Sequence, residues 1–252
     1  MTTVLQAEGI VKRFGHVTAL SGADFSVDAG EVVALIGDNG AGKSTLVKVL
    51  CGVIGHDEGT IRLKGHVVRF DSPQQARERG IETVFQDLAL APDLGPAENT
   101  FVGRELLRRG LWGKLGVLDN AEMRRRALEA FTSMGTDVKD LNAPVAALSG
   151  GQRQSVAICR SIMWASELIF LDEPTAALGV RQTRNVLQLI RRVAERGVAV
   201  VLISHNMPDV LAASDRIEVL RLGRRVARFR SKDTSVEELV GAMTGALDAV
   251  GA

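Results

Sequence analysis

A glycine-rich loop stands between an apolar, strand-like run and a helical run, and it constrains the fold more than any other feature of this chain. The run Val32 to Ile36 leads into the spacing Gly-x-x-x-x-Gly-Lys-Ser, and Lys43 to Cys51 then has helical periodicity. Glycines let the backbone wrap around phosphates, and a helix N-terminus adds favourable charge. A glycine-rich turn without a ligand is the alternative, which this context disfavours. The candidate phosphate-binding residues are Gly37, Asn39, Gly40, Ala41, Gly42, Lys43, Ser44 and Thr45.

Each reactive side chain of this loop has an expected role. Lys43 would reach the β- and γ-phosphates of a nucleotide, Ser44 would bind Mg²⁺, and Thr45 would add a phosphate contact.

Two adjacent carboxylates follow a second apolar run, Leu168 to Leu171. Asp172 is expected to hold Mg²⁺ directly or through water, and Glu173 is positioned to act on the attacking water. The pair could instead be a capping feature before Pro174, but ligand sites form at the carboxyl ends of strands. We therefore expect a second part of the same site here.

The segment Leu148 to Gln152 contains two consecutive glycines. Ser149 and Gln152 fit a capping box, which would be a good helix start and nothing more. A capping box does not explain Gly150 and Gly151, which lower helix stability but permit close approach of the backbone to a ligand. The segment is therefore a candidate ligand-binding element.

Three further candidates are weak individually. Gln86 follows the predicted strand Ile81 to Phe85, and His205 follows the predicted strand Val198 to Ser204. Residues of these types at such places are more often capping or core residues. Phe14 is a candidate for stacking on a base, and a core phenylalanine is nearly as good an interpretation.

The order of elements predicts an α/β fold. Short strand-like runs at the start predict an antiparallel sheet, and later alternation of strands and helices predicts a parallel sheet covered on both faces. Between Gln86 and Ser166 only helical stretches occur. We expect a nucleotide-binding core with a β subdomain (1–85 and 167–252) and an inserted helical subdomain (86–166) that carries Leu148 to Gln152. The predicted helices of the insertion are Pro96 to Glu105, Asn120 to Met134 and Gln152 to Ala165.

Composition excludes several classes of protein. The 252 residues contain 31 Lys plus Arg and 30 Asp plus Glu, so the net charge of +1 gives no field that attracts nucleic acid. Aromatic residues are only 4% with no Tyr, which disfavours a base-stacking surface. The apolar runs are far shorter than the roughly 20 residues that span a bilayer, and no secretory signal is visible. Cys51 and Cys159 are expected to be buried thiols.

Taken in order, the glycine-rich loop, Gln86, Leu148 to Gln152, the two carboxylates and His205 resemble the ATPase subunit of ABC transporters. The resemblance implies a P-loop NTPase (RecA-like) core that binds and hydrolyses ATP with Mg²⁺. It also implies that Ser149 to Gln152, the signature, binds the γ-phosphate of ATP held by a second subunit, so a homodimer is expected. Gln86 would contact the Mg²⁺ and water region, His205 the γ-phosphate, and Phe14 the adenine.

One branch of the family is especially similar, the monosaccharide importers of bacteria of the ribose, fructose and xylose type. The resemblance implies a transmembrane permease and an external sugar-binding protein as partners, and a peripheral location on the cytoplasmic face of the inner membrane. The segments that carry it are Ser72 to Ala76, Gly80 to Ile81, Val84 to Leu88, Ala97 to Glu105 and Ala242 to Gly245.

The chain departs from the family pattern at Gly179, where an aspartate is usual, and this puts a cross-subunit contact in doubt. The alternatives are an importer ATPase for another small solute, a soluble ABC-type ATPase that acts on DNA or ribosomes, and a P-loop kinase. The soluble ATPases usually have coiled coils or basic extensions, and a kinase does not need the signature.

Overall fold

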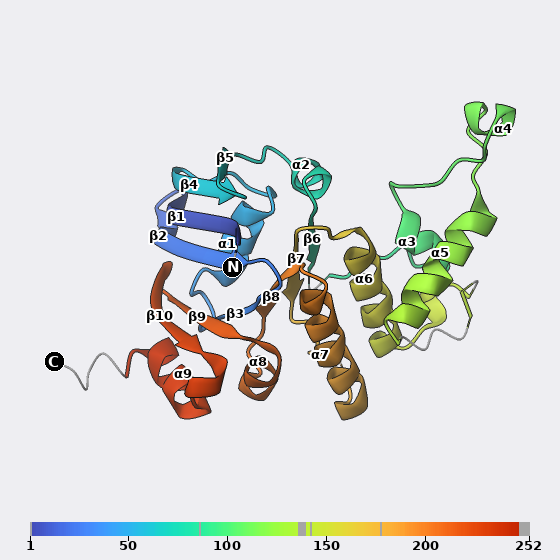
Figure 1. The fold of residues 1–252 in the computed structure, drawn as a ribbon. Coiled ribbons are helices and arrows are strands. Elements are labelled where there is room, and N and C mark those ends of the chain that lie inside the picture. The colour runs from blue at the N-terminus through green and yellow to red at the C-terminus, as the bar shows by residue number, and fades with distance from the viewer. Residues whose placement is uncertain (1, 86, 136–139, 142, 177, 247–252) are drawn as a thin grey trace.

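The computed structural model describes residues 2–85, 87–135, 140–141, 143–176 and 178–246, and within them the strands form two sheets (Figure 1). The first is antiparallel with the order β2-β1-β4-β5. The expected antiparallel sheet at the start of the chain is thus present, and its first strand begins at Thr3. Its strands are β1 (Thr3–Phe14), β2 (Val17–Asp28), β4 (Glu58–Leu63) and β5 (His66–Val68).

The second sheet has six strands in the order β10-β9-β3-β8-β7-β6, and only β10 is antiparallel to its neighbour. Every residue of β3 and β8 is buried, which explains why their sequences read as unbroken apolar runs. The predicted parallel sheet is thus confirmed. Its strands are β3 (Val32–Ile36), β6 (Ile81–Val84), β7 (Leu168–Asp172), β8 (Ala199–Ile203), β9 (Arg216–Arg221) and β10 (Arg224–Arg230).

Alternating residues of β3 assign the helices to opposite faces of this sheet. Val33 and Leu35 pack with α1 (Lys43–Leu50) and the antiparallel sheet. Val32 packs with α6 (Gly150–Trp164) and α7 (Val180–Glu195) on the other face. The remaining helices are α2 (Pro73–Glu78), which precedes β6, and α8 (Met207–Ala213) and α9 (Val236–Thr244), which pack on the same face as α7.

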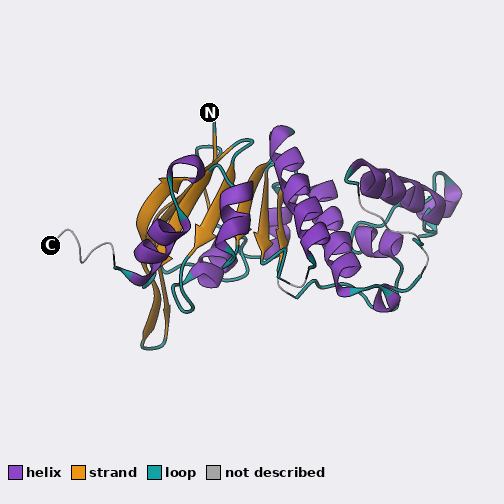
Figure 2. Ribbon diagram, turned by 90° about the horizontal axis from the view of Figure 1, so that it is seen from below, coloured by secondary structure: helices purple, strands orange, loops and turns teal. Residues whose placement is uncertain are grey.

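Between β6 and β7 the described residues form helices, and Figure 2 shows them at one end of the molecule, with the strands at the other. These are α3 (Pro96–Phe101), α4 (Leu111–Lys114), α5 (Asn120–Ser133), a 3₁₀ turn (Val145–Ala147) and α6. The expected extent of α3 to Glu105 is wrong. The helix ends at Phe101, because Val102 is extended (ψ 122°) and Gly103 has a positive φ of 74°. The sequence pattern did not predict α4.

Candidate functional site

Steric contacts require glycine at two positions of the loop between β3 and α1. A Cβ atom on Gly37 would lie 2.2 Å from the carbonyl oxygen of Leu220. At Gly42, where φ is 102°, it would lie 2.8 Å from the carbonyl oxygen of Ala19. Any larger residue would push the loop away from β9 and β2. The two glycines thus allow the start of α1 to lie directly against β9 and β2.

Lys43 points back over this loop. Its Nζ donates hydrogen bonds of 2.7 Å to the carbonyl oxygen of Gly37 and 3.0 Å to that of Asp38. Burial lowers the pKa of Lys43, while the negative charges of Glu173 and Asp172 oppose this shift. The ammonium group is therefore half-buried and is hydrogen-bonded to the loop that is expected to receive phosphates. It is also close enough to both carboxylates to interact with their charges.

The two carboxylates leave the end of β7 in different environments. Burial raises the pKa of Asp172, and the nearby charge of Glu173 raises it further. Glu173 has a φ of 50°, a left-handed conformation that is uncommon outside glycine, and its backbone N–H donates to the carbonyl oxygen of Ile203 at 2.9 Å. Strained backbone of this kind is concentrated at functional sites.

His205 orients the carboxylate of Glu173. Its Nδ1 lies 2.7 Å from Oε1 of Glu173, and its backbone N–H donates to the same oxygen at 3.1 Å. The Glu173 side chain is only 16% exposed, whereas the His205 ring is 73% exposed. The resemblance predicts a contact between His205 and a phosphate, but the pairing of His205 with Glu173 was not predictable, because nothing in the sequence says that β7 and β8 are neighbours.

The side chains here fit Mg²⁺ as it is held in nucleotide sites. Among the described residues no group of three or more His, Cys, Asp or Glu could hold a metal. Mg²⁺ bound with a nucleotide needs fewer protein ligands, because phosphates and waters complete its octahedron. The carboxylate of Asp172 and the hydroxyl of Ser44 would hold the ion. A cation would also offset the poor solvation that raises the pKa of Asp172. Bound Mg²⁺ would neutralise charge on the phosphates.

The signature residues begin α6. Ser149 Oγ accepts from the N–H of Gln152 at 3.3 Å, and Gln152 Oε1 accepts from the N–H of Ser149 at 2.9 Å, so the capping box is present. Gly151 is closely packed, because a Cβ there would lie 3.2 Å from Cδ2 of Leu178. A Cβ on Gly150 would meet nothing within 4 Å. Packing within the chain therefore does not explain Gly150.

The structure does not bring all predicted site residues together. The glycine-rich loop, Asp172 and Glu173 are close enough for their charges to interact, and His205 joins them. The signature starts α6, which packs on the opposite face of the central sheet from α1. Gln86 lies outside the described residues.

Phe14 is exposed on the surface. Phe14 is 49% exposed, and Nζ of Lys12 lies 5.5 Å from the centroid of its ring. The alternative that Phe14 is a core residue is therefore wrong. The chain passes from Phe14 into β2, whose Ala19 packs against Gly42, so the ring belongs to the same hairpin that borders the glycine-rich loop.

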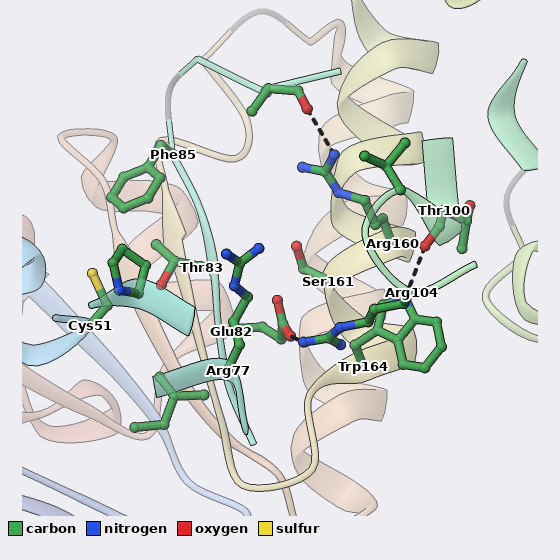
Figure 3. Close-up of a pocket in the computed structure, with 14 residues that line it drawn as sticks. Cys51, Arg77, Glu82, Thr83, Phe85, Thr100, Arg104, Arg160, Ser161 and Trp164 are labelled. Atoms are coloured by element: carbon green, nitrogen blue, oxygen red, sulfur yellow. Dashed lines mark hydrogen bonds and ion pairs between the residues drawn. The ribbon is translucent and has the colours of Figure 1, made fainter. Parts of the chain in front are cut away.

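A groove that the sequence did not predict separates the core from the helical region (Figure 3). It has a volume of about 310 Å³ and is lined by α2, β6, α3 and the end of α6. Arg160 of α6 donates to the carbonyl oxygens of Ala89 at 2.8 Å and Leu88 at 3.0 Å. Glu82 is buried, and its Oε1 accepts a hydrogen bond of 2.6 Å from Arg104. The sequence signal that could have indicated Glu82 is a charged residue within an otherwise apolar strand.

A glycine-rich loop between a buried parallel strand and a helix, facing an acidic strand end, defines the class of P-loop nucleotide-binding proteins. Within that class, the family model described as "ABC transporter" matches residues 20–176. The chain belongs to the ABC transporter ATPase family.

Similar proteins include three named for sugar import. The fructose import ATP-binding protein FrcA of Rhizobium meliloti is 49% identical over 96% of this chain and 94% of its own length. The xylose/arabinose import ATP-binding protein XylG of Sulfolobus acidocaldarius is 41% identical over 97% and 95%. The ribose import ATP-binding protein RbsA 1 of Burkholderia thailandensis is 43% identical, and this chain spans 47% of its length.

Solved structures agree with this membership. An ATP-binding cassette of an ABC transporter in its ADP conformation has a TM-score of 0.80 at 26% identity, over 97% of this chain and 96% of that one. A dimeric cassette bound to ADP and phosphate has a TM-score of 0.76 at 26% identity, over 90% and 98%. In the described part of this chain, no helix has the length and apolar character that crossing a membrane requires.

Proposed function

We propose that this chain is the ATP-hydrolysing subunit that powers import of a monosaccharide through a membrane permease, from the cytoplasmic face of the membrane. One observation carries the import assignment: the fructose import relative matches at 49% identity over 94% of its own length. The site described above supplies the chemistry of hydrolysis.

The geometry supports distinct roles for the reactive side chains. Lys43 would exchange its bonds to the carbonyl oxygens of Gly37 and Asp38 for bonds to phosphate oxygens, which compensates for its partial burial. Glu173 would accept a proton from the attacking water. His205 would hold the Glu173 carboxylate in place through the 2.7 Å contact. Phe14 would stack on the adenine, and Thr45 would contact phosphate.

A complete site needs two chains. Because α1 and α6 pack on opposite faces of the central sheet, the signature would not reach the glycine-rich loop of its own chain. We infer that two copies associate head to tail, and that Ser149 to Gln152 of one copy cover the nucleotide of the other. The open space at Gly150 suits this contact.

The groove is the proposed docking site for the permease. Its walls belong to both the proposed core (1–85 and 167–252) and the proposed helical subdomain (86–166), so a segment seated in it would respond to their relative motion. The loop that follows Gln86 is fixed to this subdomain. Asn99 is fully buried, accepts from the N–H of Ala91 at 2.8 Å, and donates to three carbonyl oxygens of the same region.

Reconstitution of the subunit with its permease in vesicles tests the proposal. We expect ATP hydrolysis to rise when an external binding protein loaded with a pentose or hexose is added to the opposite face. The same binding protein without sugar, and a Lys43→Ala subunit with the sugar-loaded protein, are the controls. Stimulation by amino acids, peptides or metals and not by monosaccharides would refute sugar import.

A further inference from the structure

A short segment between α3 and α5, residues 106–118, exposes a cluster of bulky apolar side chains, and we call it the tip (Figure 1). Leu111 is 71% exposed, Trp112 is 61% exposed and Leu115 is 67% exposed. Leu107 and Leu118 are also exposed at the base of the tip. Single exposed apolar residues are ordinary, but a cluster on one protrusion indicates a surface that something covers.

The tip is a closed structure of its own. Leu107 and Leu118 form an antiparallel bridge, and the backbone N–H of Arg108 donates to the carbonyl oxygen of Val117 at 2.9 Å. The N–H of Val117 in turn donates to the carbonyl oxygen of Trp112 at 3.0 Å. Local bonds therefore hold the tip in shape, and its exposed apolar side chains are free to make contacts elsewhere.

Three cations lie in the same segment as these apolar side chains, while Asp119 and Glu122 line a cavity at its base together with Arg108 and Arg109. Arg108, Arg109 and Lys114 lie in the tip, which contains no Asp or Glu. In the part of the chain that the structure describes, none of the three forms an ion pair with a carboxylate. Because the net charge of the whole chain is only +1, this concentration of three cations is a local feature.

The tip also projects on the side of the molecule that carries the groove. Val102 and Arg104, which immediately precede the tip, line the groove. In Figure 1, α4 and the groove-lining α2 both lie at the top of the molecule. If the groove receives the permease, the tip faces the same bilayer.

We propose that the tip binds the surface of an anionic membrane, with Leu111, Trp112 and Leu115 inserted among the lipid headgroups. Arg108, Arg109 and Lys114 would bind the lipid phosphates. Tryptophan favours the membrane interface, and each basic side chain near an anionic leaflet adds attraction. The two kinds of contact reinforce each other, as they do in other peripheral anchors. The membrane-binding proposal depends on the proposed function in one respect, namely which side of the molecule faces the membrane.

Co-sedimentation of the purified full-length chain with vesicles tests this inference without the permease. We expect binding to phosphatidylcholine vesicles that contain phosphatidylglycerol, and much weaker binding to pure phosphatidylcholine. Two variants should each bind the anionic vesicles at least roughly tenfold more weakly than the wild-type chain does. They are the apolar variant L111S/W112S/L115S and the charge variant R108Q/R109Q/K114Q. Matched controls are Val67→Ser, 68% exposed on β5, and R124Q/R184Q/K232Q, which removes three exposed cations elsewhere.

Fluorescence locates the insertion directly, because the chain has two Trp and a Trp164→Phe variant leaves Trp112 as the only emitter. Its emission should shift to shorter wavelength with anionic vesicles and be quenched by brominated lipid. Absence of vesicle binding, or binding that both tip variants retain, overturns the proposal. Crosslinks from residue 112 to the permease and not to lipid would also overturn it. ATP hydrolysis by the tip variants is measured in parallel. A failure of the proposed function can then be distinguished from a failure of the membrane-binding proposal.

Discussion

The surroundings of Asp172 conflict with its charge. Burial raises its pKa and the charge of Glu173 adds to the shift, while Lys43 only partly offsets it. Some carboxyl groups have a higher pKa in the folded than in the unfolded chain. Such a group lowers the stability of the folded state at a pH where it is ionised in both states. The left-handed φ of 50° at Glu173 adds strain of about 1–3 kcal/mol. The nucleotide-free site therefore lowers the stability of the fold.

Replacing Asp172 with asparagine should stabilise the protein and inactivate it. The free energy of unfolding should rise at pH 7, and the gain should shrink as the pH falls through the folded-state pKa towards the unfolded value of about 3.9. Hydrolysis should fall by roughly 10² to 10³, the effect of removing one group that stabilises developing charge. Urea unfolding at pH 7 and pH 5, without nucleotide, checks the first part. The exposed Asp71→Asn is the control, and a loss of stability in Asp172→Asn at pH 7 would contradict the expectation.

Local spacing was enough to nominate Lys43, Asp172 and Glu173 from the sequence, because each stands at a fixed offset from a strand or a helix. The contact between His205 and Glu173 was not predictable in the same way. It depends on β7 and β8 being parallel neighbours, with Asp172 opposite Ile203.

At the scale of elements, capping chemistry was predictable at the start of α6, where Ser149 and Gln152 form the expected capping box. At the start of α2, Ser72 is the N-cap and its Oγ accepts from the N–H of Gln75 at 3.4 Å. Gln75 Oε1 accepts from the N–H of Asp71 at 3.1 Å and not from that of Ser72, so a capping box expected from Ser72 and Gln75 is only half formed. The helix α4 escaped prediction because its four residues are too few to show a period.

Arg160 joins the signature helix to the loop after β6. In the sequence it lies 71 positions from Ala89 and 72 positions from Leu88. No local pattern could have predicted it. The guanidinium is half-buried, and burial lowers the pKa of Arg160. The two carbonyl bonds therefore satisfy a charged group that has lost much of its water.

Arg160→Gln should disconnect the two elements without removing the site. We expect ATP hydrolysis by the isolated subunit within about twofold of wild type, and a loss of about 1–3 kcal/mol in the free energy of unfolding. Stimulation by sugar-loaded binding protein in reconstituted vesicles should fall roughly tenfold or more, equivalent to about 1.4 kcal/mol of coupling. Arg124→Gln, an exposed arginine of α5, is the matched control. Undiminished stimulation would show that this contact does not transmit the signal.

At the scale of the whole molecule, the chain pattern predicted an antiparallel sheet at the start of the chain and a parallel sheet after it. It did not predict the strand order β10-β9-β3-β8-β7-β6, because that order is set by contacts between distant segments. The opposite placement of α1 and α6 follows from this order, so the separation of the glycine-rich loop from the signature became visible only in three dimensions.

This separation predicts complementation between two inactive variants. Lys43→Ala damages the glycine-rich loop and Ser149→Arg damages the signature, so neither alone should hydrolyse ATP. In an equal mixture half of the dimers contain one of each, and each such dimer has one intact site. Turnover should therefore recover to at most about a quarter of the wild-type value. Titration of one variant into the other checks this. Hydrolysis by Ser149→Arg alone would instead indicate a site complete within one chain.

The opposite placement of α1 and α6 also has a consequence for idle turnover. A lone copy in dilute solution would hold ATP without consuming it, because the proposed two-chain site takes its second half from another molecule. Two copies docked under one permease would meet at an effective concentration in the millimolar range, set by geometry and not by expression level. The permease would then act as the template that switches hydrolysis on, and surplus subunits made in excess of it would remain silent.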